Sequence, residues 1–344
     1  MPLSPSQMND LLTAALKNLG EGKWTDLSTN IQEFYGMPQL MKKEKVTFDG
    51  GTSIQRNIMV DHQDSARATE LFEVDDVNIR EQFKTIDVPW RHGTASYAFE
   101  RREVAMARGP RQLLDLVKAR RAGAMTALAI KIEEWLFGSP GSDDGKTPYG
   151  IPYWVCKHPS GGGATPGFIG TAPFGAGTYQ GNLNHARWKN WAGKYTNVTK
   201  ADLVAKMRRA ARMIQFKSPV SMPQYSGPPR RQIYLPITVL EALESLAESQ
   251  NTELGRDIAS MDGNTVFRRI PMNWVPYLDS DPDEPVYMID WEPMKICFLS
   301  GEYMNEQGPV TAPNQHTVSR VFIDLTYNVV CDDIRRQAVL SKKA

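Results

Sequence analysis

Disulfide-forming and membrane-directing features are scarce in this sequence. Its 344 residues contain three cysteines, Cys156, Cys297 and Cys331, and no CxxC pair. An odd number of separated cysteines indicates free thiols in a reducing cytoplasm. No basic-then-apolar leader opens the sequence and no apolar run reaches about 18 residues, so we expect no signal peptide and no membrane contact. With a formal net charge of only +1, the composition predicts a soluble globular protein of one or two domains.

Motifs that carry catalysis are missing as well. The GKT at 145–147 lacks the glycine that a phosphate-binding loop needs five positions earlier, where this chain has Pro140. GAGTYQG at 175–181 misses the spacing of a dinucleotide-binding turn. Cys156 and His158 stand close together, but no second pair completes a metal site, and no GxSxG occurs. The sequence therefore predicts no enzyme, no cofactor and no metal.

The longest regular pattern is helical and runs over residues 110–138. Apolar residues recur there at spacings of three and four, interrupted by Arg121. Pro110 suits the first turn and Gly138 suits the stop. A helix of this length reaches about 42 Å, which is long for a globular domain and indicates a strut.

Before this helix lie an arm and a ribbon. Residues 1–45 hold two short amphipathic segments with five basic and five acidic residues. Residues 46–99 alternate apolar and polar side chains on both sides of an acidic stretch, 61–80, which has six acids and two arginines. We expect a two-stranded ribbon with an acidic tip. Because an isolated hairpin is at best marginally stable in water, the ribbon implies a partner surface.

After Gly138 the pattern mixes loops, helices and strands. Helices are predicted to open at two capping-box pairs, Thr199 with Asp202 and Thr238 with Glu241. A strand precedes the second helix, and further strands are predicted in 266–301 and 319–330, followed by a short tail. The absence of a regular strand–helix–strand repeat predicts the α+β class.

Aromatic and basic clusters leave their role open. RWKNWAGKY, residues 187–195, sets two tryptophans and a tyrosine among an arginine and two lysines. It suits a stacking platform for single-stranded nucleic acid, a contact between subunits, or a domain core. Residues 100–121 carry seven basic and three acidic residues, and residues 200–217 carry six and one. Each is a solvated face, a contact for acidic protein, or a phosphate contact.

Several segments are similar, in their order along the chain, to one known family. They are FKTIDVPWRHGTASYAFERREV, RWKNWAGKY, VFRRIPMNWVPYLD, PVYMIDWEPMKICFLSG and RVFIDLTYNVVCDDIRRQAV. The succession resembles the major capsid proteins of tailed bacteriophages, which have the Hong Kong 97 fold. The resemblance spans nearly the whole chain, and it rests on order more than on any single motif.

The resemblance implies an α+β Hong Kong 97-like fold with five parts. These are an N-terminal arm at 1–45, an extended hairpin loop at 46–99, the spine helix of a peripheral domain at 100–139, an axial domain at 140–312, and a return strand of the peripheral domain with a C-terminal tail at 313–344.

The function implied is that of a coat protein and not of an enzyme. Copies would assemble into the hexamers and pentamers of an icosahedral phage head around double-stranded DNA, with no sequence-specific DNA contact. Further partners would be a separate scaffolding protein, a portal and a decoration protein. Assembly would take place in the cytoplasm of the host bacterium, and the protein would then reside in the virion capsid.

Candidate contact residues follow from segregated charge. The acidic tip is expected to meet a neighbour's basic surface, formed first by arginines near 100–108 and second by arginines of 208–212. The candidate contacts are Asp61, Asp64, Glu70, Glu73, Asp75, Asp76, Arg101, Arg102, Arg108, Arg208, Arg209 and Arg212. The candidate packing residues are four tryptophans, Trp90, Trp135, Trp188 and Trp191. For Trp188 and Trp191 we prefer packing or a subunit contact to stacking on nucleic-acid bases.

Two departures from the family pattern matter. Some members carry a long scaffolding segment before the arm, whereas here only residues 1–45 precede the hairpin, so we expect no large proteolytic maturation. One branch links a hairpin lysine covalently to a neighbour, but residues 61–80 contain no lysine, so we expect no such crosslink. Two alternatives remain: an encapsulin-like nanocompartment shell of the same fold, and a nucleic-acid-binding module using 187–217.

Overall fold

The computed structural model describes most of the chain outside the arm and several loops. The described residues are 35, 36, 38, 46–61, 68, 70, 81–100, 102, 103, 110–140, 144–158, 166–169, 187–216, 230–248, 265–312 and 315–342. The chain forms two compact units. The first comprises Met1–Asp49, Arg91–Glu134 and Phe298–Tyr327, and the second comprises Gly50–Trp90, Trp135–Cys297 and Asn328–Ala344. The amphipathic segments predicted in the arm lie outside the described residues.

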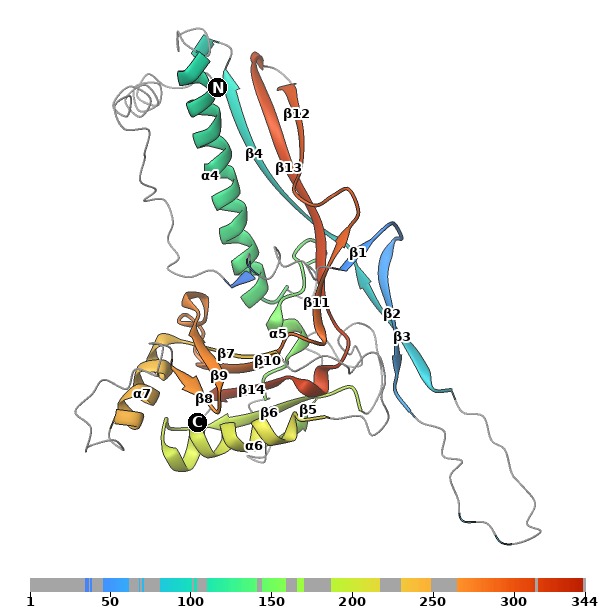
Figure 1. Cartoon of the computed structure of the whole chain (residues 1–344), viewed down its shortest axis with the longest axis vertical. Coiled ribbons are helices and arrows are strands. Elements are labelled where there is room, and N and C mark those ends of the chain that lie inside the picture. The colour runs from blue at the N-terminus through green and yellow to red at the C-terminus, as the bar shows by residue number, and fades with distance from the viewer. Residues whose placement is uncertain are drawn as a thin grey trace. The chain divides into compact units, whose positions relative to one another are not determined.

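The sheet of the first unit is built on one long strand, β13 (Gln315–Cys331). Strands β4 (Arg91–Glu100) and β12 (Asn305–Ala312) both pair with it antiparallel. Figure 1 shows these three strands side by side. β11 (Met294–Leu299) and β1 (Val46–Phe48) complete the order β1-β11-β13-β12. The strand predicted around Ser96–Phe99 therefore belongs to this sheet and not to the ribbon, because its hydrogen-bonding partner is β13.

The long helix of the sequence analysis is confirmed as α4 (Pro110–Phe137), which ends directly before Gly138. Two arginines tie it to strands of the first unit. The Arg120 guanidinium donates to the Ala98 carbonyl at 2.6 Å and pairs with Glu103 at 2.9 Å. Arg121, which breaks the apolar stripe, pairs with Glu306 of β12 at 2.5 Å. The interruption in the pattern is thus a structural contact.

A buried carboxylate on α4 holds the described end of the arm. Glu133 is 1% exposed and accepts a hydrogen bond from the Tyr35 amide at 2.8 Å and another from the Gly36 amide. These two hydrogen bonds fix where the described end of the arm meets the helix. No sequence signal distinguished this glutamate from the exposed ones.

The second unit contains a seven-stranded sheet in the order β5-β6-β14-β10-β7-β9-β8. Its strands are β5 (Gly167–Ile169), β6 (Asn190–Tyr195), β14 (Ala338–Lys342), β10 (Val286–Asp290), β7 (Arg231–Leu235), β9 (Ile270–Trp274) and β8 (Val266–Phe267). The strand predicted before the second helix is confirmed as β7, which ends at Leu235, and strands predicted within 266–301 are confirmed as β8 to β11. The mixed content of helices and strands confirms the α+β class.

Two helices cover one face of this sheet (Figure 1). α6 (Ala205–Met213) inserts Met207 and Ala210, and α7 (Ile237–Glu248) inserts Val239, against apolar side chains of β6, β7, β10 and β14. On the other face, Phe137 meets Tyr234 edge to face at 5.3 Å between ring centroids. Trp154 of α5 (Ile151–Trp154) is fully buried there.

The end of the chain is a central strand of this sheet, where the sequence predicted only a tail. β14 pairs parallel with β6 and antiparallel with β10. Ala338, Val339 and Leu340 have no exposed surface. A run of three apolar residues near a terminus is too short to reveal such a strand, because its partners lie about 145 and 50 positions away (338 against 191 and 288).

The two predicted helix caps have different outcomes. Thr199 is confirmed as an N-cap, since its side chain accepts from the Asp202 amide ahead of a π-helical turn, Lys200–Val204, that leads into α6. The cap predicted at Thr238 is wrong. α7 already begins at Ile237, whose amide donates to the Asp279 carboxylate at 2.8 Å. A residue far along the chain supplies this cap, so local spacing could not find it.

The ribbon consists of β2 (Ser53–Met59) and β3 (Phe83–Pro89), paired antiparallel throughout. At its base Ile54, Ile86 and Val88 are fully buried. Farther out its side chains become exposed. The two strands are therefore anchored in the core of the second unit at their base.

Candidate interaction surfaces

The outer end of the described ribbon carries an exposed apolar pair. Phe83 is 57% and Met59 38% exposed, and the two residues stand opposite each other in the antiparallel register. Side chains of directly opposed residues point to the same face of a ribbon. Two large apolar side chains held side by side in water form a surface suited to contact with another protein.

The acidic residues of the ribbon begin at Asp61, which is bound within its own chain. The Arg187 guanidinium lies 3.0 Å from the Asp61 carboxylate and 3.4 Å from the Val60 carbonyl. Both partners are about one third to one half exposed, so the pair contributes little stability. Glu70 is exposed. The other predicted tip contacts, Asp64, Glu73, Asp75 and Asp76, lie outside the described residues.

The first predicted basic surface is described only in part. Arg102 is exposed, while Arg101 and Arg108 lie outside the described residues. Its neighbour Glu103 is 8% exposed and already paired with Arg120. Arg102 is therefore the described cation of this group that faces solvent.

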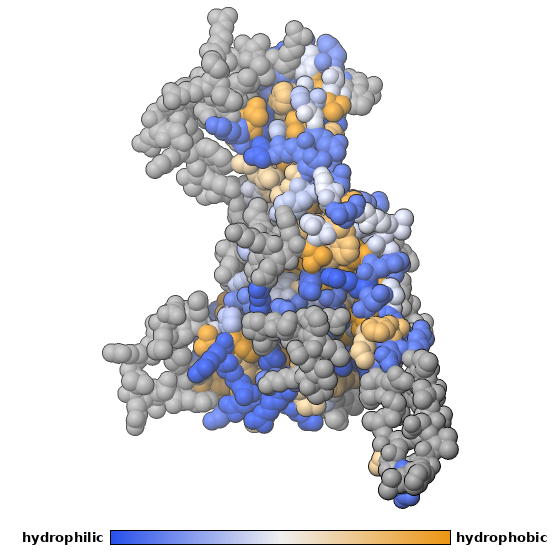
Figure 2. Space-filling view, turned by 45° about the vertical axis from the view of Figure 1, so that its right-hand side comes forward, coloured by the Kyte–Doolittle hydropathy of each residue, from blue (hydrophilic) through white to orange (hydrophobic). Residues whose placement is uncertain are grey.

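The second predicted basic surface lies on the outer side of α6. Arg208, Arg209 and Arg212 are all exposed, opposite the buried Met207 and Ala210. Within the part of the chain that the structure describes, none of these three guanidinium groups has an ion-pair or hydrogen-bond partner. Figure 2 shows hydrophilic residues gathered along the lower edge of the second unit, where α6 lies. The structure thus brings these three predicted residues together.

The lone acid next to this surface is fully engaged. The Asp202 carboxylate accepts from the Thr196 and Asn197 amides at 2.7 and 2.9 Å and pairs with Lys206 at 2.5 Å. Partial burial acts to raise the pKa of Asp202, but these hydrogen bonds outweigh it and lower the pKa. Asp202 therefore stays ionised, and its contacts are with the Thr196 and Asn197 amides and with Lys206, not with the exposed arginines.

The tryptophans of RWKNWAGKY point inward. Trp191 on β6 has no exposed surface and belongs to the core under α6, and Trp188 is 4% exposed. A ring buried in this way offers no face to a nucleic-acid base. Trp90 is half-buried and donates to the Gly51 carbonyl at 2.9 Å. Trp135, near the end of α4, is also half-buried.

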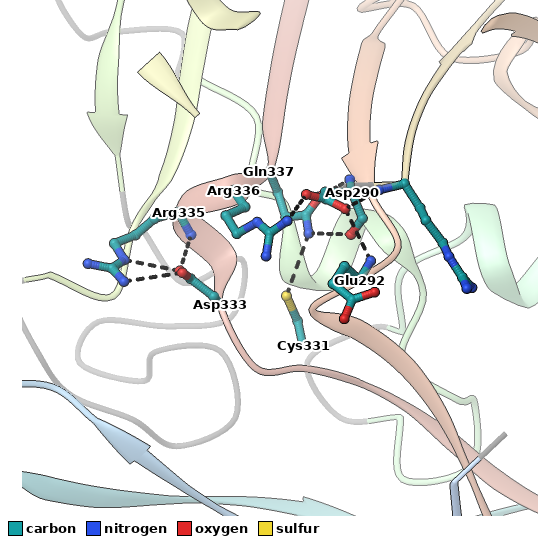
Figure 3. A network of polar contacts seen from close by, with 8 residues as sticks. Asp290, Glu292, Cys331, Asp333, Arg335, Arg336 and Gln337 are labelled. Carbon is teal, nitrogen blue, oxygen red and sulfur yellow. Dashed lines mark hydrogen bonds and ion pairs between the residues drawn. The ribbon is translucent and has the colours of Figure 1, made fainter. Parts of the chain in front are cut away.

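A buried polar network joins the short helical turn directly before β14 (Ile334–Arg336) to β10 (Figure 3). Asp290 is fully buried and pairs with Arg336, which is 6% exposed. Gln337 closes the network, because its side chain accepts from the Asp290 amide at 2.8 Å and donates to the Asp290 carbonyl at 2.9 Å. No sequence pattern indicated this network, because Asp290 and Arg336 are indistinguishable from exposed charged residues until the fold buries them.

All three thiols are buried, and burial raises the pKa of Cys297 to about 12 and that of Cys331 well above its usual value. A thiol must lose its proton to act as a nucleophile or ligand. Across the described ranges no group of three or more His, Cys, Asp or Glu side chains could hold a metal ion. No described helix has the length and apolarity needed to cross a membrane.

Comparison with known proteins gives matches by structure and none by sequence. No family model and no curated protein matches the chain. The capsid asymmetric unit of cyanophage A-1(L) matches with a TM-score of 0.59 and 16% identity, over 95% of this chain and 98% of that one. The chain has the fold of phage capsid proteins. The capsid of the Myoviridae phage XM1 also matches, with a TM-score of 0.51 and 13% identity over 95% and 98% of the two chains.

A cellular shell protein shares this capsid fold. The SrpI encapsulin of Synechococcus elongatus matches with a TM-score of 0.50 and 8% identity, over 93% of this chain and 92% of that one. Sequence identities this low indicate a shared fold and do not indicate what a shell encloses. The function therefore has to be argued from the surfaces of this chain.

Proposed function

We propose that this protein is the major capsid protein of a tailed bacteriophage. Copies of it form the hexamers and pentamers of an icosahedral head that encloses double-stranded DNA, and its role is structural. The observation that carries the proposal is the match with the cyanophage capsid subunit along nearly the full length of both chains. A shell subunit works through its contacts with further copies, and an obligate assembly buries large areas for this purpose.

The parts of the chain take their expected roles on this proposal. Residues 1–45 are the arm, 46–99 carry the extended loop in β2 and β3, 100–139 the spine helix, 140–312 most of the axial domain, and 313–344 the return strand and tail. Within these ranges β4 and β12 belong with the return strand β13, with which they pair, and β14 belongs with the axial sheet. The ribbon β2–β3 supports the assignment of the loop, because it is anchored at its base and exposes Phe83 at its outer end.

Contacts between subunits begin at this ribbon. Its exposed apolar pair lies on a neighbouring subunit, and its acidic tip meets basic surface there. The group of Arg102 is the first candidate for that surface, and the arginines of α6 are the second candidate if they do not contact DNA. Ring contacts of this type join different patches head to tail. Asp61 is already paired with Arg187 of its own chain, so on this proposal the contact with the neighbour is assigned to the acids that follow Asp61.

Deletion of residues 61–76 tests this role. The shortened protein should remain a folded subunit and fail to form shells, because the deleted segment serves the neighbour. Circular dichroism and urea unfolding measure the first property, and electron microscopy of the expressed protein, with and without a scaffolding protein, measures the second. Loss of folding would show that 61–76 belongs to the core of its own subunit.

An encapsulin-like shell is the second candidate, supported by the match to SrpI. The two functions differ in cargo. Purified native particles that contain double-stranded DNA favour the phage capsid, whereas particles that contain a protein cargo favour the nanocompartment. A separate scaffolding protein, a portal and a decoration protein are further partners on the phage proposal, and the virion is the location of the assembled protein.

A further inference from the structure

The outer surface of α6 has the composition of a phosphate-binding surface. Arg208 and Arg212 are separated by one helical turn, about 6 Å along the axis, and Arg209 lies beside them. All three are exposed. Lys200, at the start of the preceding turn, is exposed as well. The guanidinium group suits phosphate because its planar set of donors matches two oxygens at once.

Other uses of the three arginines fit the structure less well. In the described residues they take part in no ion pair, and Asp202, the nearby acid, is occupied by Lys206 and two amides. They are not needed for folding, since the buried face of α6 is apolar. Contact with an acidic protein surface is the other use open to these arginines, and the experiment below separates it from DNA contact.

We infer that the arginine surface of α6, formed by Arg208, Arg209 and Arg212, contacts the phosphate backbone of double-stranded DNA without reading its sequence. The inference rests on the proposed capsid function, which brings DNA to the protein, and it names the surface that the DNA meets. Three cations per subunit give weak binding that many copies in a shell add together. Release of counterions makes this binding depend steeply on salt.

The test measures binding of the full-length, unassembled subunit to a fluorescent duplex of mixed sequence at several salt concentrations. The variant replaces Arg208, Arg209 and Arg212 by Gln. The control variant changes net charge equally, by replacing three scattered exposed cations with Gln: Lys118, Arg268 and Arg320. Unfolding in urea checks that both variants remain folded.

The expected result is a difference in salt dependence. Three phosphate contacts contribute about −2.7 to the slope of log K against log salt. The ratio of the wild-type association constant to that of the α6 variant should therefore fall about 40-fold between roughly 0.05 M and 0.2 M salt. The control variant should keep the wild-type slope. A mixed-sequence and an A·T-rich duplex should bind equally.

Three outcomes would overturn the inference. In the first, the α6 variant binds DNA with the affinity and salt dependence of the wild type. In the second, the control variant loses as much DNA affinity as the α6 variant does. In the third outcome the α6 variant keeps DNA binding and fails to form shells by electron microscopy, which would assign the surface to an acidic neighbour. Failure of the wild type to form shells bears on the proposed function instead, since DNA binding is measured on subunits.

Discussion

Replacement of Phe83 by Ser should weaken assembly without weakening the subunit. Phe83 is 57% exposed at the outer end of the ribbon. A Phe side chain offers about 200 Å², so about 110 Å² is available for burial, worth about 3 kcal/mol at 25 cal/mol per Å². Loss of that burial should lower the association constant of each ribbon contact roughly 100-fold. Exposed substitutions change the free energy of unfolding by about 0.5 kcal/mol or less.

The concentration at which shells first form, followed by light scattering and negative-stain microscopy, measures the effect of Phe83→Ser. Urea unfolding of the free subunit measures its stability. The matched control is Val266→Ser, because Val266 is 50% exposed on the edge strand β8 and outside the ribbon. It should assemble as the wild type does. The reasoning fails if Phe83→Ser assembles at the wild-type concentration, if the control is equally impaired, or if Phe83→Ser loses more than about 2 kcal/mol of folding stability.

Three further substitutions follow from the structure. Asp290→Ala should lower the free energy of unfolding by about 3–5 kcal/mol, because it leaves buried Arg336 unpaired, and replacing both residues by Leu and Met should cost much less; urea titration would contradict this if the single and double variants were alike. Gly150→Ala should lower the thermal midpoint sharply, because its Cβ would stand 2.2 Å from a backbone oxygen at the end of α4; an unchanged midpoint would refute the close approach. Reversal of Asp75 and Asp76 to Lys should slow assembly, as should salt above about 0.15 M, and a charge reversal at the arginine partner should restore the rate; if no arginine reversal does so, the tip is only a solvated surface.

Local features of the fold were predictable from the sequence because their causes are local. α4 begins at Pro110 and ends before Gly138, where the two residues act through their own backbone geometry. Thr199 caps its helix through the amide of Asp202, three positions on. The alternation in β2 and β3 follows from a ribbon that is buried on one side at its base. In each case the interacting groups are near neighbours in the chain.

The order of segments also led to the α+β class and to the resemblance with phage capsid proteins. The fold is shared with the cyanophage capsid subunit at only 16% identity, because a fold constrains where strands and turns stand more than which residues fill them. The charge segregation likewise gave three arginines of α6 as candidates. Their exposure and their lack of partners within the described residues became known only from the structure.

Pairing across the chain was decided by tertiary structure alone. The strand before Glu100 leaves the ribbon for β13, and the final strand β14 enters the middle of a sheet beside β6. Nothing in a strand's own pattern names its partner, since backbone hydrogen bonds are the same for every sequence. Burial follows the same logic: Asp290 and Arg336 become a buried pair only when β14 reaches β10. The sequence determines which segments form strands, and the packing of the whole unit determines which strands pair with one another.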